Sequence, residues 1–290
     1  MNLSHCEICP NKCGADRTRA RGLCHAPSEA RICRIALHPW EEPIISGTRG
    51  SGTVFFAGCP LSCVFCQNDE ISHSPVGRAY TVTELIDEMK RLVDEGAHNI
   101  NFVSPTHYAH ILVDALSRYR PPVPVVYNTG GYDRVEILRA LEGLVDVYLP
   151  DLKYLSPALA KRYCGKEDYP SVAVAALDEM FRQVGEVQVK NGLLCRGMLV
   201  RHLVLPSHSD EGVRVMEYLT RQYGDRIYIS AMSQYTPHAR ACEFPEINRR
   251  LKPIEYKRVV AALIRAGQNN CFVQDGESSD DAYIPPFTLS

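Results

Sequence analysis

The chain has 290 residues, of which 45% are hydrophobic and 23% are charged, a composition typical of globular proteins. Its net charge of −2 argues against a protein that binds nucleic acid or anionic membranes through bulk charge. No apolar run approaches the roughly 18 residues needed to span a bilayer. The first residues also lack the apolar segment of a signal peptide, so we expect a cytoplasmic protein.

Residues 1–47 contain few apolar runs, and we predict that they form an irregular, metal-binding extension. In a reducing compartment, clustered cysteines indicate metal binding rather than disulfides. Four thiolates complete either a tetrahedral zinc site or a closed iron–sulfur cluster, and four unbound thiols are the remaining alternative. Six Lys and Arg against three Asp and Glu in residues 1–40 would offset the negative charge of such a centre. The candidate auxiliary ligands are Cys6, Cys9, Cys13 and Cys24.

Residues 48–268 alternate between apolar runs and helical patterns. Nearly continuous apolar runs are typical of parallel strands that are covered on both faces. The pattern predicts an α/β fold, with an open doubly wound sheet as the alternative to a curled, partial barrel. The polar stretch that follows, 269–290, is expected to be a C-terminal extension draped over the surface. The predicted strands are 53–57, 99–104, 123–127, 145–149, 198–205 and 226–231.

Five helices are expected between and after these strands. A capping box at Thr81 and Glu84 predicts the start of the first helix, and Gly96 predicts its end. The others are predicted near 111–119, 174–184, before Gly224, and near 259–264 from their apolar spacing.

Three further cysteines follow the first predicted strand, at Cys59, Cys63 and Cys66. A cubane iron–sulfur cluster normally takes four thiolates, so three leave one iron without a protein ligand. An open metal position is where chemistry can occur. The alternative is a closed cluster or zinc site that takes its fourth ligand from a distant part of the chain.

The Cys-x3-Cys-x2-Cys spacing, with Phe65 just before the third cysteine, resembles the signature of the radical S-adenosylmethionine (SAM) superfamily. The flanking segments 52–58 and 67–72 resemble its pyruvate formate-lyase activating enzyme-like branch. The resemblance covers about residues 1–265. It implies a partial (β/α)6 TIM-like barrel, a [4Fe–4S] cluster on the three cysteines, and SAM bound at the open iron.

Polar residues at the predicted strand ends are the candidate contacts of SAM, because ligands bind at the carboxyl ends of parallel strands. A Gly-Gly-Glu-like turn is usual in the superfamily after the second strand. This chain has Ser104-Pro105-Thr106-His107 instead, which is also readable as a helix cap. The candidate set is Phe65, Ser104, Thr106, His107, Thr129, Asp151, Lys153, Arg201 and His202.

Thr129, Asp151 and Lys153 match a Thr and an Asp-x-Lys that bind SAM and a monovalent cation in the glycyl-radical activases that the chain resembles. Asn128 replaces an Asp there, which makes the pocket less anionic. A buried ion pair is the alternative reading of Asp151 and Lys153. Strand alternation sends one of Arg201 and His202 inward and the other outward, and a satisfied core histidine is the alternative for His202.

The resemblance implies reductive cleavage of SAM to a 5′-deoxyadenosyl radical, which then abstracts a hydrogen atom from the substrate. The reaction most similar to this pattern is activation of a partner glycyl-radical enzyme, with flavodoxin or ferredoxin as reductant. Radical modification of a small molecule or short peptide is the second hypothesis. A non-enzymatic iron–sulfur or zinc protein is the third. No protein side chain is nominated as catalytic, since the radical comes from the cofactor.

Overall fold

The computed structural model describes residues 1–74, 76–274 and 287. These residues form one sheet of ten strands in the order β10-β9-β8-β6-β5-β4-β2-β1-β3, with β7 paired to β8. The six predicted strands are confirmed, and all pair in parallel. They are β2 (Ser51–Phe56), β4 (Ile100–Val103), β5 (Val125–Thr129), β6 (Val147–Pro150), β8 (Leu193–Leu203) and β9 (Tyr228–Met232).

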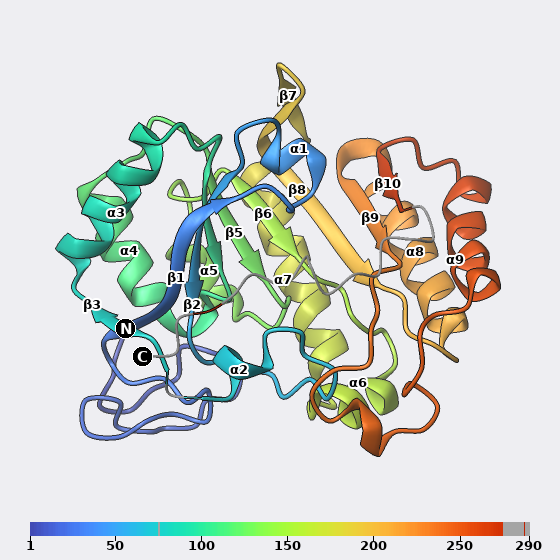
Figure 1. Cartoon of the computed structure of the whole chain (residues 1–290), viewed down its shortest axis with the longest axis horizontal. Coiled ribbons are helices and arrows are strands. Elements are labelled where there is room, and N and C mark those ends of the chain that lie inside the picture. The colour runs from blue at the N-terminus through green and yellow to red at the C-terminus, as the bar shows by residue number, and fades with distance from the viewer. Residues whose placement is uncertain (75, 275–286, 288–290) are drawn as a thin grey trace.

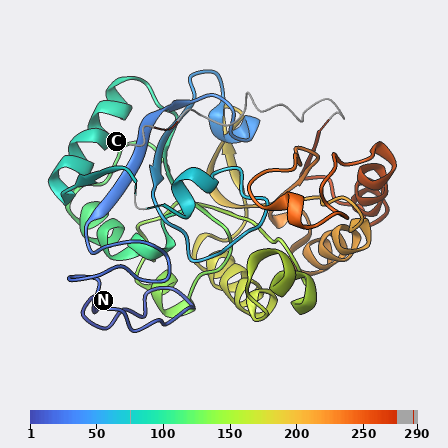
Figure 2. The ribbon, with the colours of Figure 1, turned by 60° about the horizontal axis from the view of Figure 1, so that its bottom comes forward.

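The helices lie around the outside of this curved sheet (Figures 1 and 2). The five predicted helices are confirmed, and the Thr81–Glu84 capping box is present at the start of the first of them. The architecture agrees with the predicted partial (β/α)6 barrel. The α-helices are α1 (Pro43–Ser46), α2 (Asp69–Ser72), α3 (Val82–Asp94), α4 (Ala109–Arg118), α5 (Val135–Arg139), α6 (Pro157–Cys164), α7 (Tyr169–Val184), α8 (Ser209–Tyr223) and α9 (Pro253–Arg265).

The structure differs from the sequence-based expectation at both ends of the sheet. The prediction that residues 1–47 are irregular is wrong for β1 (Ala30–His38), which pairs antiparallel with β2 and with β3 (Arg78–Tyr80). The strand β1 is only partly buried and contains arginines, so its sequence lacks the continuous apolar run by which the other strands were predicted. The C-terminal extension begins with a further strand of the sheet, β10 (Cys271–Val273). Its polar tail, 275–286 and 288–290, lies outside the described residues.

All strands of the parallel core end at the same edge of the sheet, which is where ligands bind in such folds. The arrowheads of β5 and β6 in Figure 1 point toward the end of the molecule that carries α2 and the N-terminal loops. α1 and the hairpin strand β7 (Gln188–Lys190) lie at the opposite end. The loop of Cys59, Cys63 and Cys66 lies between β2 and α2, so the fold brings it to the ligand-binding edge.

The first 29 residues contain no helix or strand among those described, and they pack against the cysteine loop. The Cys59 N–H donates to the Cys24 carbonyl over 3.2 Å, and the Asn11 amide donates to the Pro60 carbonyl over 2.9 Å. No described helix has the length and apolar character to cross a membrane.

Candidate functional site

Cys59, Cys63 and Cys66 line one cavity of about 250 Å³ at the strand ends, together with Phe65. The loop is held by backbone hydrogen bonds: the Ser62 N–H donates to the Cys164 carbonyl over 3.2 Å. The Cys66 sulfur lies 3.5 Å from the Ser72 hydroxyl on α2. Three sulfurs facing one cavity are the donor set that the motif predicts for a cluster with one open iron.

Two other cysteines approach this set without lining the cavity. Cys164 interacts electrostatically with Cys63, and its thiol donates to the Ala160 carbonyl over 3.0 Å. Cys24 interacts electrostatically with Cys59, but its other sulfur neighbours are N-terminal cysteines. Among the described residues that line the cavity, the only cysteines are therefore the three of the motif.

Burial raises the pKa of the Cys59 thiol to about 12 and raises the pKa values of Cys63 and Cys66. Desolvation disfavours the thiolates, whereas the nearby Lys153 ammonium favours them and lowers the pKa of all three cysteines by a smaller amount. The cysteines are thus thiols until a cationic centre binds them, and binding releases their protons.

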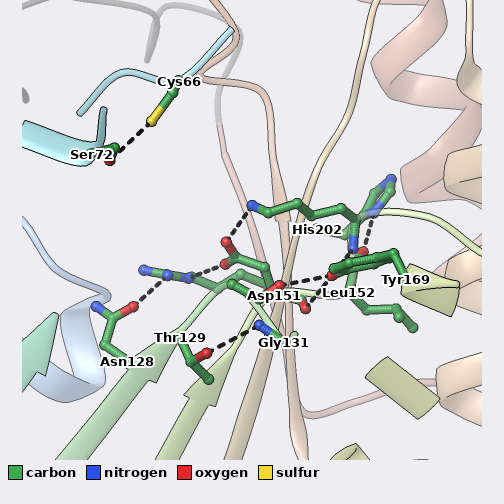
Figure 3. A network of polar contacts seen from close by, with 12 residues as sticks. Cys66, Ser72, Asn128, Thr129, Gly131, Asp151, Leu152, Tyr169 and His202 are labelled. Carbon is green, nitrogen blue, oxygen red and sulfur yellow. Dashed lines mark hydrogen bonds and ion pairs between the residues drawn. The ribbon is translucent and has the colours of Figure 1, made fainter. Parts of the chain in front are cut away.

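Asp151 is the centre of a charged network on the other side of this cavity (Figure 3). Its carboxylate accepts from Lys153 Nζ at 2.7 Å and from Arg201 Nε at 3.0 Å. Arg201 also donates to the Asn128 side-chain oxygen at 2.7 Å. Burial by itself would raise the pKa of Asp151, but the two cations outweigh it and hold that pKa below its usual value.

Arg201 and Lys153 both stay charged in this setting. Burial disfavours their charge, but the Asp151 carboxylate raises both pKa values. The cavity therefore presents a fixed ammonium and a fixed guanidinium near the three thiols. Such groups recognise carboxylates.

Thr129 and Ser104 also line the cavity. The Thr129 hydroxyl donates to the buried Asp133 carboxylate at 2.5 Å and accepts from the Gly131 N–H at 3.2 Å. Ser104 has a positive φ of 56°, unusual for a residue other than glycine, at the end of β4. The structure thus brings together Phe65, Ser104, Thr129, Asp151, Lys153 and Arg201 with the three cysteines.

Three candidate SAM contacts are not brought to the cavity lining. His202 points away from it: its Nδ1 bonds the Leu152 carbonyl at 2.7 Å and its Nε2 approaches Gly212 of α8. Alternation along β8 turns Arg201 inward and His202 outward, so His202 lies outside the cavity lining.

Thr106 and His107 are buried one layer behind the cavity. The Thr106 hydroxyl lies 3.2 Å from that of Thr129. His107 Nε2 lies 2.8 Å from the Ala57 carbonyl, and burial lowers the pKa of His107 to about 3. These residues support the strand ends rather than facing the cavity.

Sequence reasoning missed the acidic wall of the cavity, which comes from the loop after β1. Glu41 accepts from the side-chain amides of Asn101 and Asn128 at 2.8 and 2.7 Å, and lies 3.4 Å from Arg201. Trp40 beside it lines the cavity and is 59% exposed. The adjacent pair Glu41-Glu42, directly before a proline, was the available signal. An irregular segment, as predicted for residues 1–47, assigns this pair to no strand end and therefore to no cavity.

The N-terminal cysteines gather in one group, apart from the cavity. Cys9 interacts electrostatically with Cys6, Cys13 and Cys24. In the described part of the chain, no group of three or more His, Cys, Asp or Glu side chains is already arranged to hold a metal ion. This holds for Cys59, Cys63 and Cys66 too, so in both places a metal would have to draw the thiolates together.

Comparison with known proteins assigns the family. Residues 53–219, more than half of the chain, match the radical SAM superfamily. A protein of Methanocaldococcus jannaschii described as "Uncharacterized protein MJ0674" is 30% identical over 280 residues, which cover 92% of this chain and 76% of that protein. The chain therefore belongs to the radical SAM superfamily.

Solved structures of Streptococcus suis SuiB share the fold. The SAM-bound form has a TM-score of 0.51 at 13% identity, over 73% of this chain and 47% of SuiB. The form bound to the precursor peptide SuiA also has a TM-score of 0.51 at 13% identity, over 73% of this chain and 46% of SuiB. The chain thus spans about half the length of SuiB.

Membership of the superfamily implies a [4Fe–4S] cluster and SAM. The residues present fit both, because three sulfurs face one cavity and a paired ammonium and guanidinium face it from the strand ends.

Proposed function

We propose that this radical SAM enzyme activates a partner glycyl-radical enzyme by removing a hydrogen atom from one of its glycine residues. Cys59, Cys63 and Cys66 would hold the cluster, and SAM would lie against Lys153 and Thr129. When bound, the cluster and SAM supply the 5′-deoxyadenosyl radical that takes the hydrogen atom.

The arrangement of Lys153 and Asp151 is the observation that carries this proposal. These two residues, with Thr129, form the strand-end pattern that resembles the glycyl-radical activases. In the structure they line the same cavity as the three cysteines. The 2.7 Å contact with Asp151 orients the Lys153 ammonium, so it is ready to receive the carboxylate of SAM without further ordering.

The other residues that line the cavity suit the insertion of a polypeptide loop of a partner protein. Leu61 and Phe65 beside the cysteines give apolar surface that excludes water from the reacting atoms. Trp40, which also lines the cavity and is largely exposed, offers an aromatic surface against which a polypeptide loop can pack. SuiB, which shares only the fold, has been solved with a precursor peptide bound.

The proposal also includes a second metal centre at the N-terminal cysteines and an electron-donating partner. The donor would be a small redox protein such as flavodoxin or ferredoxin. The gathering of Cys6, Cys9, Cys13 and Cys24 supports the second centre.

The test uses the anaerobically reconstituted full chain with dithionite, SAM and a synthetic peptide whose central glycine carries deuterium on Cα. The expected result is 5′-deoxyadenosine that contains one deuterium. The control is the same peptide with deuterium only on a neighbouring alanine, which should give unlabelled product. Unlabelled 5′-deoxyadenosine with both peptides would refute glycine activation and leave modification of a small molecule. Absence of 5′-deoxyadenosine would refute SAM cleavage itself.

A further inference from the structure

We infer that Cys6, Cys9, Cys13 and Cys24 hold an anionic four-thiolate metal centre, that Arg17 is its buried counter-charge, and that this centre fixes the backbone of the loop carrying Cys59. This inference deepens the second centre proposed above. Its ligand chemistry suits either zinc or a [4Fe–4S] cluster, since both take four thiolates.

Two of the four cysteines lie beside Gly22. Cys24 and Cys13 place their sulfurs 3.3 and 3.5 Å from the position that a Cβ on Gly22 would occupy. Cys24 also interacts electrostatically with Cys6, and Cys9 with all three others. A side chain at position 22 would therefore crowd the sulfurs of Cys13 and Cys24, and electrostatic interactions link Cys6 and Cys9 to the same group.

Arg17 is buried beside these sulfurs, with only 1% of its surface exposed. Its Nη1 lies 3.7 Å from the Cys6 sulfur, and its Cδ lies 3.8 Å from the same Gly22 Cβ position. The guanidinium also donates to the carbonyls of Pro27 and His107.

Within the described residues, Arg17 makes no ion pair with a carboxylate. The nearest acid in the sequence, Asp16, contacts Arg19 and Thr18 instead. The guanidinium donates to carbonyl oxygens, approaches the Cys6 sulfur and lies over the ring of Tyr108. None of these contacts is with a carboxylate, so its buried positive charge lacks an acidic partner. A metal bound by four thiolates is a compact anion in that place, so it would supply the missing negative charge.

The first 29 residues need such a centre for their own order. They form no described helix or strand, and few of their apolar side chains are buried, chiefly Ile8 and Ala26. A short segment without a core of its own is commonly ordered by a structural metal.

The same segment joins the loop of the radical cluster through its backbone. The Cys24 carbonyl accepts from the Cys59 N–H over 3.2 Å, and Asn11 donates to the Pro60 carbonyl over 2.9 Å. Arg17 also donates to the His107 carbonyl at 2.6 Å, and His107 in turn bonds Ala57. In Figure 2 the N-terminal loops lie next to the segment that follows β2. A metal that tightens residues 6–24 would therefore hold the first ligand of the radical cluster in place.

Metal content is the first test, and it is made on the full-length triple variant Cys59→Ala, Cys63→Ala, Cys66→Ala, which cannot assemble the radical cluster. After anaerobic loading we expect about four irons with inorganic sulfide, or about one zinc, per chain. Changing Cys9 and Cys13 to serine in this background should abolish that content. A triple variant that binds neither metal would overturn the inference while leaving SAM cleavage by the unmodified chain intact.

Hydrogen exchange in the same triple variant tests the link between the two loops. Loading the N-terminal centre should slow exchange of the amide at position 59 at least tenfold compared with the chelator-stripped protein. The amide of Ile229 serves as the control, because it donates to the Asn270 carbonyl and its strand, β9, lies five places from β2 in the sheet order. Equal exchange at position 59 with and without metal would overturn the claim that the centre holds this loop.

Substitution of Arg17 separates a counter-charge from a structural hydrogen-bond donor. If Arg17 neutralises the centre, Arg17→Met should lower the melting temperature of the metal-loaded protein by about 5 °C more than that of the stripped protein. Both forms lose the hydrogen bonds to the Pro27 and His107 carbonyls, so only the difference between them reports the counter-charge. Arg17→Lys, which keeps the charge, should recover part of the loss. Equal lowering in the loaded and stripped forms would show a purely structural role and overturn the assignment.

Discussion

Replacing Gly58 by alanine tests how closely the N-terminal segment packs on the cysteine loop. Gly58 has a φ of 83°, and a Cβ there would lie 2.3 Å from the Cys24 carbonyl oxygen. An alanine in the left-handed region costs about 1–2 kcal/mol. Forcing one backbone away from another adds about 1–3 kcal/mol, so Gly58→Ala should destabilise the protein by about 2–5 kcal/mol.

Gly143 provides the matched control. Its φ of 77° is similar, but a Cβ there would meet nothing within 4 Å. Gly143→Ala should therefore lower the free energy of unfolding by about 1–2 kcal/mol, which is the effect of the left-handed backbone alone.

Thermal unfolding of both variants by circular dichroism measures the difference. One kcal/mol shifts the melting temperature by about 2–4 °C in chains of roughly this size. The shift in Gly58→Ala should exceed that in Gly143→Ala by about 2–12 °C. Equal shifts would show that the segment around Cys24 yields freely, and the close packing inferred here would be refuted.

Three further outcomes are expected. Cys63→Ala should abolish formation of 5′-deoxyadenosine, measured by chromatography. Cys195→Ala is the control, because Cys195 lies outside the cavity lining, and this variant should still form the product. Product formation by Cys63→Ala would contradict the cluster assignment. Lys153→Met should weaken SAM binding about 10- to 100-fold in equilibrium dialysis, because one charged hydrogen bond is lost. The control is Lys161→Met, at an exposed lysine. Equal SAM affinities of the two variants would refute the contact with Lys153. Burial lowers the pKa of His107 to about 3 in the folded protein, against about 6.5 in the unfolded chain. Between pH 3 and pH 6.5, the imidazole is therefore protonated in the unfolded chain and neutral in the folded protein. His107 therefore contributes its full stability above pH 6.5, and the free energy of unfolding should fall by up to about 1.4 kcal/mol per pH unit below it. Urea unfolding between pH 6.5 and 4.5 should show a smaller slope for His107→Gln, and an unchanged slope would argue against a neutral buried ring.

The cysteine loop and the parallel core could be predicted because both depend on spacing along the chain. Three thiols within eight residues can reach one cavity, as they do here, and nearly continuous apolar runs at regular intervals are typical of covered parallel strands. Alternation of side chains along a strand predicted that only one of Arg201 and His202 points inward, and the structure shows that it is Arg201.

Only the tertiary structure showed which distant residues share a wall of the cavity. Glu41 reaches Asn128 and Arg201 from a loop far away in the chain, and Arg17 reaches Cys6 and the carbonyl of His107. These contacts depend on how β1 pairs with β2 and on how the first 29 residues fold over the strand ends. A pattern of short period carries no information about such pairings, so the charges that surround the two cysteine groups became visible only when the chain was folded.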